Sequence, residues 1–230
     1  MHGPRSSRPS PDIGALVEGI RDGMVGMDAD VAMFPLGSVL FPAMPLPLRV
    51  FEPRYLQMLQ DLLPDGPAEF GVVLIERGQE VGGGEKRFDV GTIAQVADIK
   101  VADGHLALLG EGTRRIEVVD WLTEDPYPRA LVRELAPLEW DDDLSERRDQ
   151  TEALVRRTLV RAGEFDELSW SPSVELSDDP VDALWQLAAV APLGALDQLS
   201  LLRCETSRRL LDAIFAATQD AGETLEARGL

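Results

Sequence analysis

The chain has 230 residues, of which 44% are apolar, so it is long enough to form one large domain or two small ones around a hydrophobic core. Its 22 basic and 41 acidic residues give a net charge of -19, which repels phosphate backbones and anionic lipid and excludes nucleic acid and membranes as expected partners. The one cysteine, Cys204, cannot form an internal disulfide and indicates a cytoplasmic location. Two histidines are too few for a histidine-rich metal site.

The first part of the chain divides into a polar extension and an uncharged segment. Residues 1–30 contain too few apolar side chains to order themselves, and we assign them no function. They are expected to be either a disordered extension or the product of a mis-assigned start codon, with Met24, Met27 and Met33 as alternative starts. Residues 31–48 carry no charge, but four prolines exclude a membrane-spanning helix, because lipid cannot satisfy the carbonyls that each proline frees. We also expect these prolines to prevent regular strand pairing. They are Pro35, Pro42, Pro45 and Pro47.

Residues 31–140 are predicted to be rich in β-strands. Asp103-Gly104 favours a two-residue turn and predicts a hairpin between residues 99–102 and 105–108. One helix interrupts the strands, because Pro53 suits a first helical position and apolar residues follow it at helical spacing. Short runs rich in Val, Ile and Leu predict strands at residues 70–75, 91–101, 105–109, 115–121 and 129–138.

Residues 141–220 are predicted to be helical, and residues 221–230 form a tail. The aspartates at 141–143 are suited to cap and charge the first helix, whose apolar stripe ends at Ala162. A second helix is predicted to begin at Asp179-Pro180 and to run to about Val190, and a third helix is predicted over residues 196–219.

Several segments, taken in order, resemble a known family. The resemblance covers about residues 33–219, and the family is the Lon protease N-terminal domain, also called the Lon substrate-binding domain. It implies an α+β fold, in which a small twisted β pseudo-barrel of the PUA-like kind precedes a C-terminal helical bundle. The matching segments are Phe34 to Pro42, Met44 to Tyr55, Gly71 to Ile75, Val90 to Ala94 and Gly110 to Ile116.

The resemblance implies a free-standing member that lacks the ATPase and peptidase modules of Lon. The segment Gly82 to Arg87 has a carboxylate before its lysine and no hydroxyl after it, so it is not a Walker A loop. Neither Lys86, in that loop, nor Lys100, which is expected to face water, is suited to a Ser-Lys peptidase dyad. We therefore expect no enzymatic activity and no cofactor.

For three other features we prefer a structural interpretation to a catalytic or ligand-binding one. Cys204 has no accompanying histidine and is expected to be a core or boundary residue. His105 follows the predicted turn and is expected to be an exposed strand residue rather than a ligand. The aspartates at 141–143 lack the alternating ligands of a calcium loop, so no metal site is predicted.

The candidate binding residues are apolar. Phe41, Met44, Leu46 and Leu48 belong to the proline-rich segment, where they either plug the end of the barrel or form an exposed surface that accepts apolar peptide. Trp121 and Tyr127, together with Trp140, are candidates to line a groove between the barrel and the helices. Glu52, Pro53 and Arg54 are assigned a structural role at the start of the predicted helix, whereas Trp185 is expected in the core.

The leading hypothesis is a protein that binds exposed hydrophobic segments of unfolded polypeptides, with a link to protein quality control. One alternative is a scaffold or adaptor that docks on a separate protease or ATPase. A second alternative, a small hydrolase of the Lon peptidase type, requires a nucleophile and a base that the sequence does not bring together.

Overall fold

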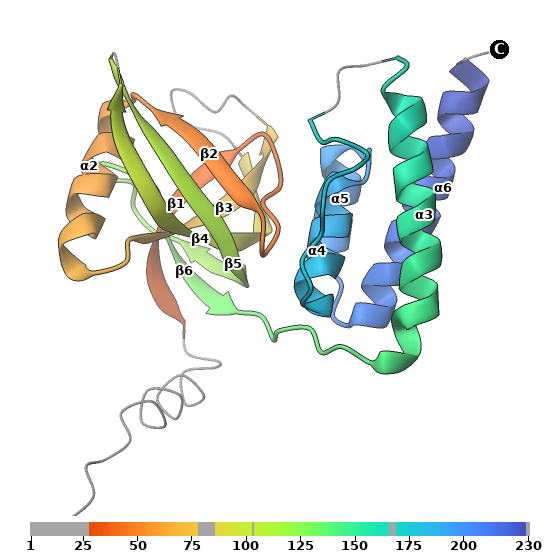
Figure 1. The fold of residues 1–230 in the computed structure, drawn as a ribbon. Helices are drawn as coiled ribbons and strands as arrows, with labels where there is room; N and C mark the ends of the chain where they lie inside the picture. Colours follow the sequence, from red (N-terminus) through yellow and green to blue (C-terminus); the bar gives the residue numbers. More distant parts are fainter. Residues whose placement is uncertain (1–27, 78–85, 103, 166–168, 229–230) are drawn as a thin grey trace, which may run out of the picture.

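The computed structural model describes residues 28–77, 86–102, 104–165 and 169–228. Most of the predicted extension, the glycines at 82–84 and Asp103 of the predicted turn lie outside the described residues. A β-barrel carries one helix on its outer side and a layer of four helices on the other side (Figure 1). The predicted α+β fold, with strands first and helices after them, is confirmed.

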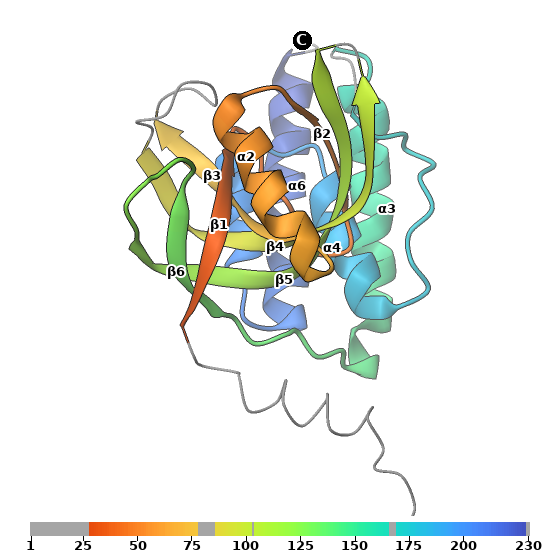
Figure 2. The same ribbon diagram turned by 90° about the vertical axis from the view of Figure 1, so that its left-hand side faces the viewer.

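The barrel is one sheet that closes on itself. Its strand order is β2-β5-β4-β3-β1-β6, and an additional pairing of β5 with β6 completes the ring. The long strand β5 makes this closure possible, because its first half pairs with β2 and its second half with β6 (Figure 2). The strands are β1 (Ala29–Leu36), β2 (Pro45–Val50), β3 (Glu69–Arg77), β4 (Lys86–Ala102), β5 (His105–Trp121) and β6 (Arg129–Glu134).

The predicted hairpin between β4 and β5 is confirmed. Ala102 pairs with His105, and Gly104 has the positive φ of 76° that this turn needs. The two runs predicted at 105–109 and 115–121 form one continuous strand. Gly112 lies between them, and it is required there, because a Cβ atom on it would lie 2.1 Å from the carbonyl oxygen of Phe41.

The expectation that prolines prevent strand pairing around residues 45–48 is wrong. Pro45 and Pro47 belong to β2, which pairs with β5 in antiparallel register and lies at the edge of the sheet. The two prolines occupy alternate positions, so their nitrogens point away from β5, while Leu46 and Leu48 supply the donors that the pairing needs. An edge strand therefore accommodates both prolines.

The helix α2 (Pro53–Leu62) covers the outer side of the barrel. Pro53 occupies the first turn, as the sequence predicts, and Tyr55, Met58 and Leu59 are buried. The rings of Phe34 in β1 and Tyr55 stack with centroids 3.9 Å apart. The one-turn 3-10 helix η1 (Leu63–Asp65) follows α2 and leads to β3.

The helical part has an inner and an outer layer. The inner helices α4 and α5 lie between the barrel and the outer pair α3 and α6 (Figure 1). The outer helices run in parallel, because their contacts Asp143–Arg208, Arg147–Asp212 and Arg161–Glu226 each join residues 65 positions apart. The helices are η2 (Asp142–Leu144), α3 (Ser145–Ala162), α4 (Pro180–Val190), α5 (Ala195–Leu202) and α6 (Ser207–Arg228).

Two helix predictions need correction. The predicted third helix is two helices, α5 and α6, because the chain turns after Leu202 and Thr206 begins α6 by accepting a hydrogen bond from the Arg209 amide at 3.2 Å. The second of these helices also continues to Arg228. The side chain of Asp141 caps no helix, whereas Asp179 caps α4 as its sequence position suggests.

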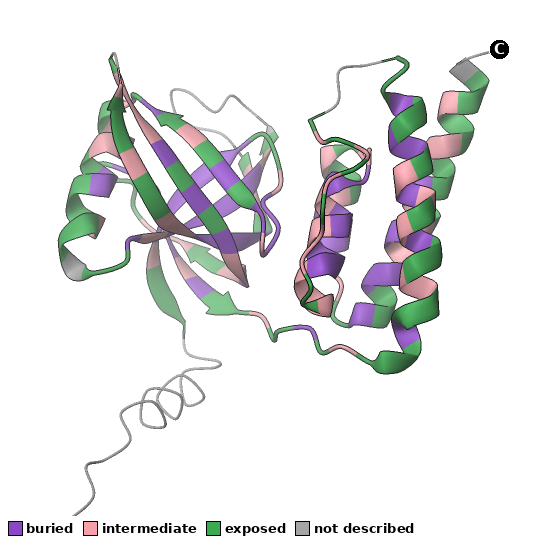
Figure 3. Ribbon diagram, in the orientation of Figure 1, coloured by how far each residue is buried: buried purple, intermediate pink, exposed green. Residues whose placement is uncertain are grey.

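One hydrophobic core joins the barrel to the inner helices. It contains Phe41 and Leu46 from the barrel and Leu184, Trp185 and Leu199 from the helices, so Trp185 is a core residue as expected. Purple, buried segments alternate with exposed ones along the strands and line the facing sides of the helices (Figure 3). The barrel and the helices thus share buried surface, and a groove lies at the edge of their contact.

Candidate binding groove

A groove of about 580 Å³ lies between the edge of the barrel and the inner helices. On the barrel side it is lined by the end of β1, the β1–β2 connection and the first half of β2. On the helical side it is lined by the end of α4, the α4–α5 turn and the loop before α4. The main apolar lining residues are Leu36, Val39, Leu40, Phe41, Met44, Leu46, Leu48, Leu159, Trp170, Val190, Pro192 and Leu193.

The β1–β2 connection is held rigidly against the sheet. The Gly112 amide donates to the Met44 carbonyl at 2.9 Å, and the Ala43 amide donates to the Gly112 carbonyl at 2.8 Å. The buried Thr92 hydroxyl donates to the Leu40 carbonyl at 2.6 Å. These contacts satisfy the main chain of a segment that proline removes from regular structure. The barrel side of the groove is therefore preformed.

The structure resolves whether the proline-rich segment is exposed. Phe41, Met44 and Leu46 are 1%, 6% and 8% exposed and form the floor of the groove. Leu48 and Val39 are half-buried and present part of their surface to it. The segment thus serves partly as a plug of the core and partly as a groove wall, which combines the two alternatives that the sequence leaves open.

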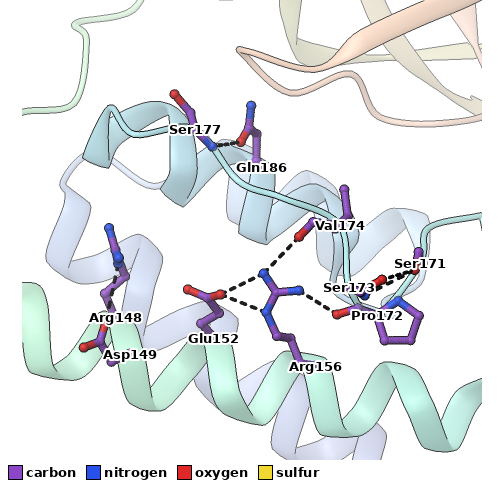
Figure 4. Close-up of polar contacts among 10 residues, drawn as sticks. All are labelled: Arg148, Asp149, Glu152, Arg156, Ser171, Pro172, Ser173, Val174, Ser177 and Gln186. Carbon is purple, nitrogen blue, oxygen red and sulfur yellow. Dashed lines mark hydrogen bonds and ion pairs between the residues drawn. The ribbon is translucent and has the colours of Figure 1, made fainter.

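A half-buried network fixes the loop on the helical side. Figure 4 shows the Arg156 guanidinium between Glu152 on its own helix and the carbonyl oxygens of the loop residues Pro172 and Val174, at 2.6 and 3.0 Å. This loop follows Trp170, which lines the groove. Arg156 therefore holds the loop that continues from Trp170.

Gln186 on α4 joins the same loop to the barrel. Its side-chain oxygen accepts a hydrogen bond from the Ser177 amide at 2.7 Å, and its nitrogen donates to the Ala43 carbonyl at 3.2 Å (Figure 4 shows the first contact). One amide side chain thus contacts both walls at one end of the groove.

Arg115 fastens the helical layer to the sheet. It is 5% exposed, and its guanidinium donates to the carbonyl oxygens of Ala136, Leu202 and Cys204 at 2.7, 3.0 and 2.5 Å. It also lies 5.0 Å from the ring centre of Trp185. Burial lowers the pKa of Arg115. Its position at the end of α5, where carbonyls lack helical partners, explains why a cation is accommodated there.

Trp121 and Tyr127 do not line the groove. The Arg87 guanidinium lies over the Trp121 ring, 4.4 Å from the ring centre. The Tyr127 hydroxyl donates a hydrogen bond to Asp61 of α2 at 3.1 Å. Burial, assisted by Asp61, raises the pKa of Tyr127. Both residues therefore belong to the side of the barrel that α2 covers, and the structure separates them from the four apolar residues of the proline-rich segment.

The residues at the start of α2 form an ion-pair network. Arg54 lies 3.1 Å from Glu52 across Pro53 and 2.8 Å from Glu124, which Arg87 also contacts at 3.0 Å. Burial opposes protonation of Arg54, but the neighbouring Tyr55, Glu52 and Glu124 outweigh it and raise its pKa. The network joins α2 to the barrel and lies outside the groove lining.

The remaining candidates have ordinary surroundings. Lys100 is exposed and lies 2.7 Å from Asp98. His105 is half-buried, and Arg49 donates to it at 3.4 Å. Cys204 is half-buried in the α5–α6 turn, and burial raises its pKa. In the part of the chain that the structure describes, no group of His, Cys, Asp and Glu is arranged to hold a metal. None of the described helices is long and apolar enough to cross a bilayer.

Sequence reasoning missed Trp170 and Arg115. A large aromatic residue in the polar Ser169–Pro172 stretch was a usable signal for Trp170. For Arg115 the signal was weaker. Arg114 and Arg115 are consecutive in a strand, so their side chains point to opposite faces and one of them must face inwards.

Comparison with known proteins identifies the family. The family model of the ATP-dependent protease La (LON) substrate-binding domain matches residues 30–215. Lon protease 2 from Herpetosiphon aurantiacus is 31% identical over 112 residues, which cover 47% of this chain and 14% of that protein. Lon protease from Bacillus thuringiensis is 25% identical over 203 residues, which cover 85% of this chain and 25% of that protein. The chain thus spans a quarter or less of these two relatives.

Solved structures agree with this assignment. A Lon N-terminal domain protein from Xanthomonas campestris has a TM-score of 0.58 and 27% identity, and the match covers 82% of this chain and 98% of that chain. The N-terminal domain of the Mycobacterium avium complex Lon protease has a TM-score of 0.59 at 15% identity, which shows the fold alone, with 84% and 99% coverage. The matched region is the non-catalytic part of the protease. The chain belongs to the family of Lon substrate-binding domains.

Proposed function

We propose that the groove binds exposed hydrophobic segments of other polypeptides and that the chain acts without catalysis, in the manner of a substrate-recognition domain. The observation that carries this proposal is the lining of the groove, which is mostly apolar and contains no charged side chain. Residues 31–140 and 141–220 act together in this proposal, because each provides one wall. A cytoplasmic location, where unfolded chains arise, is part of the same proposal.

The geometry favours recognition of side chains over addition of a β-strand. The outer edge of β2 offers carbonyl oxygens at Pro45 and Pro47 but no N–H donors there, so a client strand finds only half of its usual partners. Apolar side chains instead gain free energy by burial against the groove. At roughly 25 cal/mol per Å², 300 Å² of buried apolar area contributes about 7 kcal/mol before the entropic cost of association, which leaves weak binding.

The test is a titration of the protein into a fluorescein-labelled peptide of twelve residues with a core of Leu, Phe and Val between Ser and Gln residues. We expect binding in the micromolar range by fluorescence anisotropy. Val39→Asp and Leu193→Asp place a charge on half-buried groove positions and are expected to weaken binding at least tenfold. Val160→Asp, at a position on α3 that is 58% exposed and outside this groove, is the matched control.

Circular dichroism and thermal unfolding of each variant separate loss of binding from loss of fold. Absence of binding at high micromolar protein overturns the proposal, and so does equal binding by the groove variants and the control. In a parallel incubation with casein, with and without ATP and Mg²⁺, we expect no cleavage. Cleavage that one defined substitution abolishes supports the hydrolase alternative instead.

A further inference from the structure

An acidic surface borders one end of the groove. Glu111 on β5 pairs with Pro45 of β2, and Pro45 lines the groove. Asp182 on α4 precedes Gln186 by one helical turn on the same face, and Gln186 contacts the Ala43 carbonyl beside Met44. Glu111 and Asp182 therefore both lie near the Met44–Pro45 end of the groove, close enough for the charge of Glu111 to act on Asp182.

These carboxylates lack basic partners. None of the ion pairs among the described residues involves Glu111, Asp179 or Asp182. Asp179 is occupied as the cap of α4, where it accepts from the amides of Val181 and Asp182 at 2.9 and 3.0 Å. Burial, then the charges of Asp179 and Glu111, raises the pKa of Asp182. A cation placed between these groups relieves their repulsion.

Neither the groove lining nor β2 offsets these carboxylates. The groove lining itself carries no charge, so the interior does not offset them. Arg49, at the other end of β2, is four residues from Pro45 and thus about 14 Å away, which exceeds the distance of about 8–10 Å over which salt screens exposed charges. A ligand in the groove therefore meets an apolar interior and, at the Met44–Pro45 end, the carboxylates of Glu111 and Asp182.

We propose that the preferred ligands are extended polypeptide segments in which Lys or Arg directly flanks the apolar residues, and that acidic flanks are rejected. This proposal rests on the proposed function, because the groove must first accept the apolar part. Exposed ion pairs are individually weak, so two carboxylates together select a basic over a neutral flank by about two- to thirtyfold. Specificity of this kind comes from complementary charge at the rim of an apolar site.

The experiment compares three peptides that share one apolar core and differ in flanks of Lys, Gln or Glu. In 0.15 M salt we expect affinity to fall in that order, with a step of about two- to thirtyfold from Lys to Gln, and we expect the step to shrink at 0.5 M salt. Glu111→Gln with Asp182→Asn should remove the step and leave the Gln-flanked peptide unchanged. Glu111→Gln alone, at an exposed position, should reduce the logarithm of this step by about half.

The control is Asp120→Asn with Asp220→Asn, which makes the same change in net charge at exposed positions outside the groove lining. If the control removes the step as well, the preference reflects overall charge and the proposal is wrong. If all three peptides bind equally, it is also wrong, while the proposed function stands. If the Gln-flanked peptide fails to bind at all, the proposed function itself has failed.

Discussion

The two sides of the barrel are covered in different ways. On one side α2 follows β2 after two residues, and its arginine Arg54 shares the carboxylate of Glu124 with Arg87. On the other side the helical layer follows a linker, and the buried Arg115 that fastens it donates to main-chain carbonyls. The first contact is between opposite charges near the surface, and the second is between a charge and dipoles in the interior.

The difference follows from how each helix reaches its position. The short connection and the buried Tyr55, Met58 and Leu59 already restrict α2, so its ion pairs are expected to add little. The helical layer shares a buried core with the barrel but has no short connection to it, and Arg115 adds hydrogen bonds to carbonyl oxygens at the end of α5 that lack helical partners. Removal of this cation should therefore cost more than removal of a cation beside α2.

The largest expected effect is that of Arg115→Ala. It leaves three buried or half-buried carbonyl oxygens without their donor, and we expect the free energy of unfolding to fall by about 3–5 kcal/mol. Arg87→Ala, on the other side, should cost about 1 kcal/mol. Urea unfolding followed by tryptophan fluorescence measures both. Similar losses for the two variants contradict the distinction between the two sides.

Cys204 provides an independent measure of the same junction. Its thiol is half-buried, burial raises its pKa, and its carbonyl accepts from Arg115, so the native thiol should react slowly with a thiol reagent at pH 8. In Arg115→Lys, where one ammonium replaces the planar fork, we expect faster labelling without complete unfolding. Unchanged labelling indicates that the α5–α6 turn does not depend on Arg115.

A smaller effect is expected where the barrel and the β1–β2 connection meet. In Gly112→Ala, the new Cβ atom lies 2.1 Å from the Phe41 carbonyl oxygen, so the main chain must shift, and we expect a loss of about 2–3 kcal/mol in the free energy of unfolding. Gly194→Ala is the matched control, because its nearest neighbour is an Asp197 side-chain oxygen at 3.7 Å. Thermal unfolding of both variants checks this, and equal stability contradicts a tight contact at Gly112.

Local signals in the sequence were sufficient to predict where several helices and one hairpin lie. Pro53 predicted the start of α2, Asp103-Gly104 predicted the hairpin, and Asp179-Pro180 predicted the start of α4. Each of these features depends on backbone preferences of a few adjacent residues, which the sequence states directly. The α+β fold also followed from the resemblance to a known family, which several ordered segments carried.

The sequence predicted the residues on one side of the groove and not those on the other. Its barrel side contains Phe41, Met44, Leu46 and Leu48, all identified from the uncharged proline-rich run. Its helical side was not identified, because Trp170 reaches the groove through contacts distant in sequence. The same reason explains the wrong third helix. No pattern within residues 196–219 predicts that Arg115 of β5 donates to the carbonyl oxygens of Leu202 and Cys204, where α5 ends.

A local effect is expected in the loop that supports Trp170. Arg156→Ala removes the donor to Pro172 and Val174, and we expect faster hydrogen exchange of the amides at residues 171–177, with a change of about 1 kcal/mol or less in global stability. Arg157→Ala, at the next and exposed position of α3, is the control. Exchange that is equally slow in both variants shows that the loop is held by other contacts.

The smallest expected effect is a pH dependence on the α2 side. Burial and Asp61 raise the pKa of Tyr127 above its ordinary value of 10.0, so the neutral phenol is favoured in the folded state. This contribution is fully present below the unfolded pKa and is lost as pH rises through the folded pKa. Between pH 9 and 11 the free energy of unfolding should therefore fall more steeply in the wild type than in Tyr127→Phe, by about 1 kcal/mol or less. Urea unfolding at each pH measures the two slopes, and since all other titrating groups are shared, parallel curves would show that the Tyr127–Asp61 contact contributes nothing to holding α2 on the barrel.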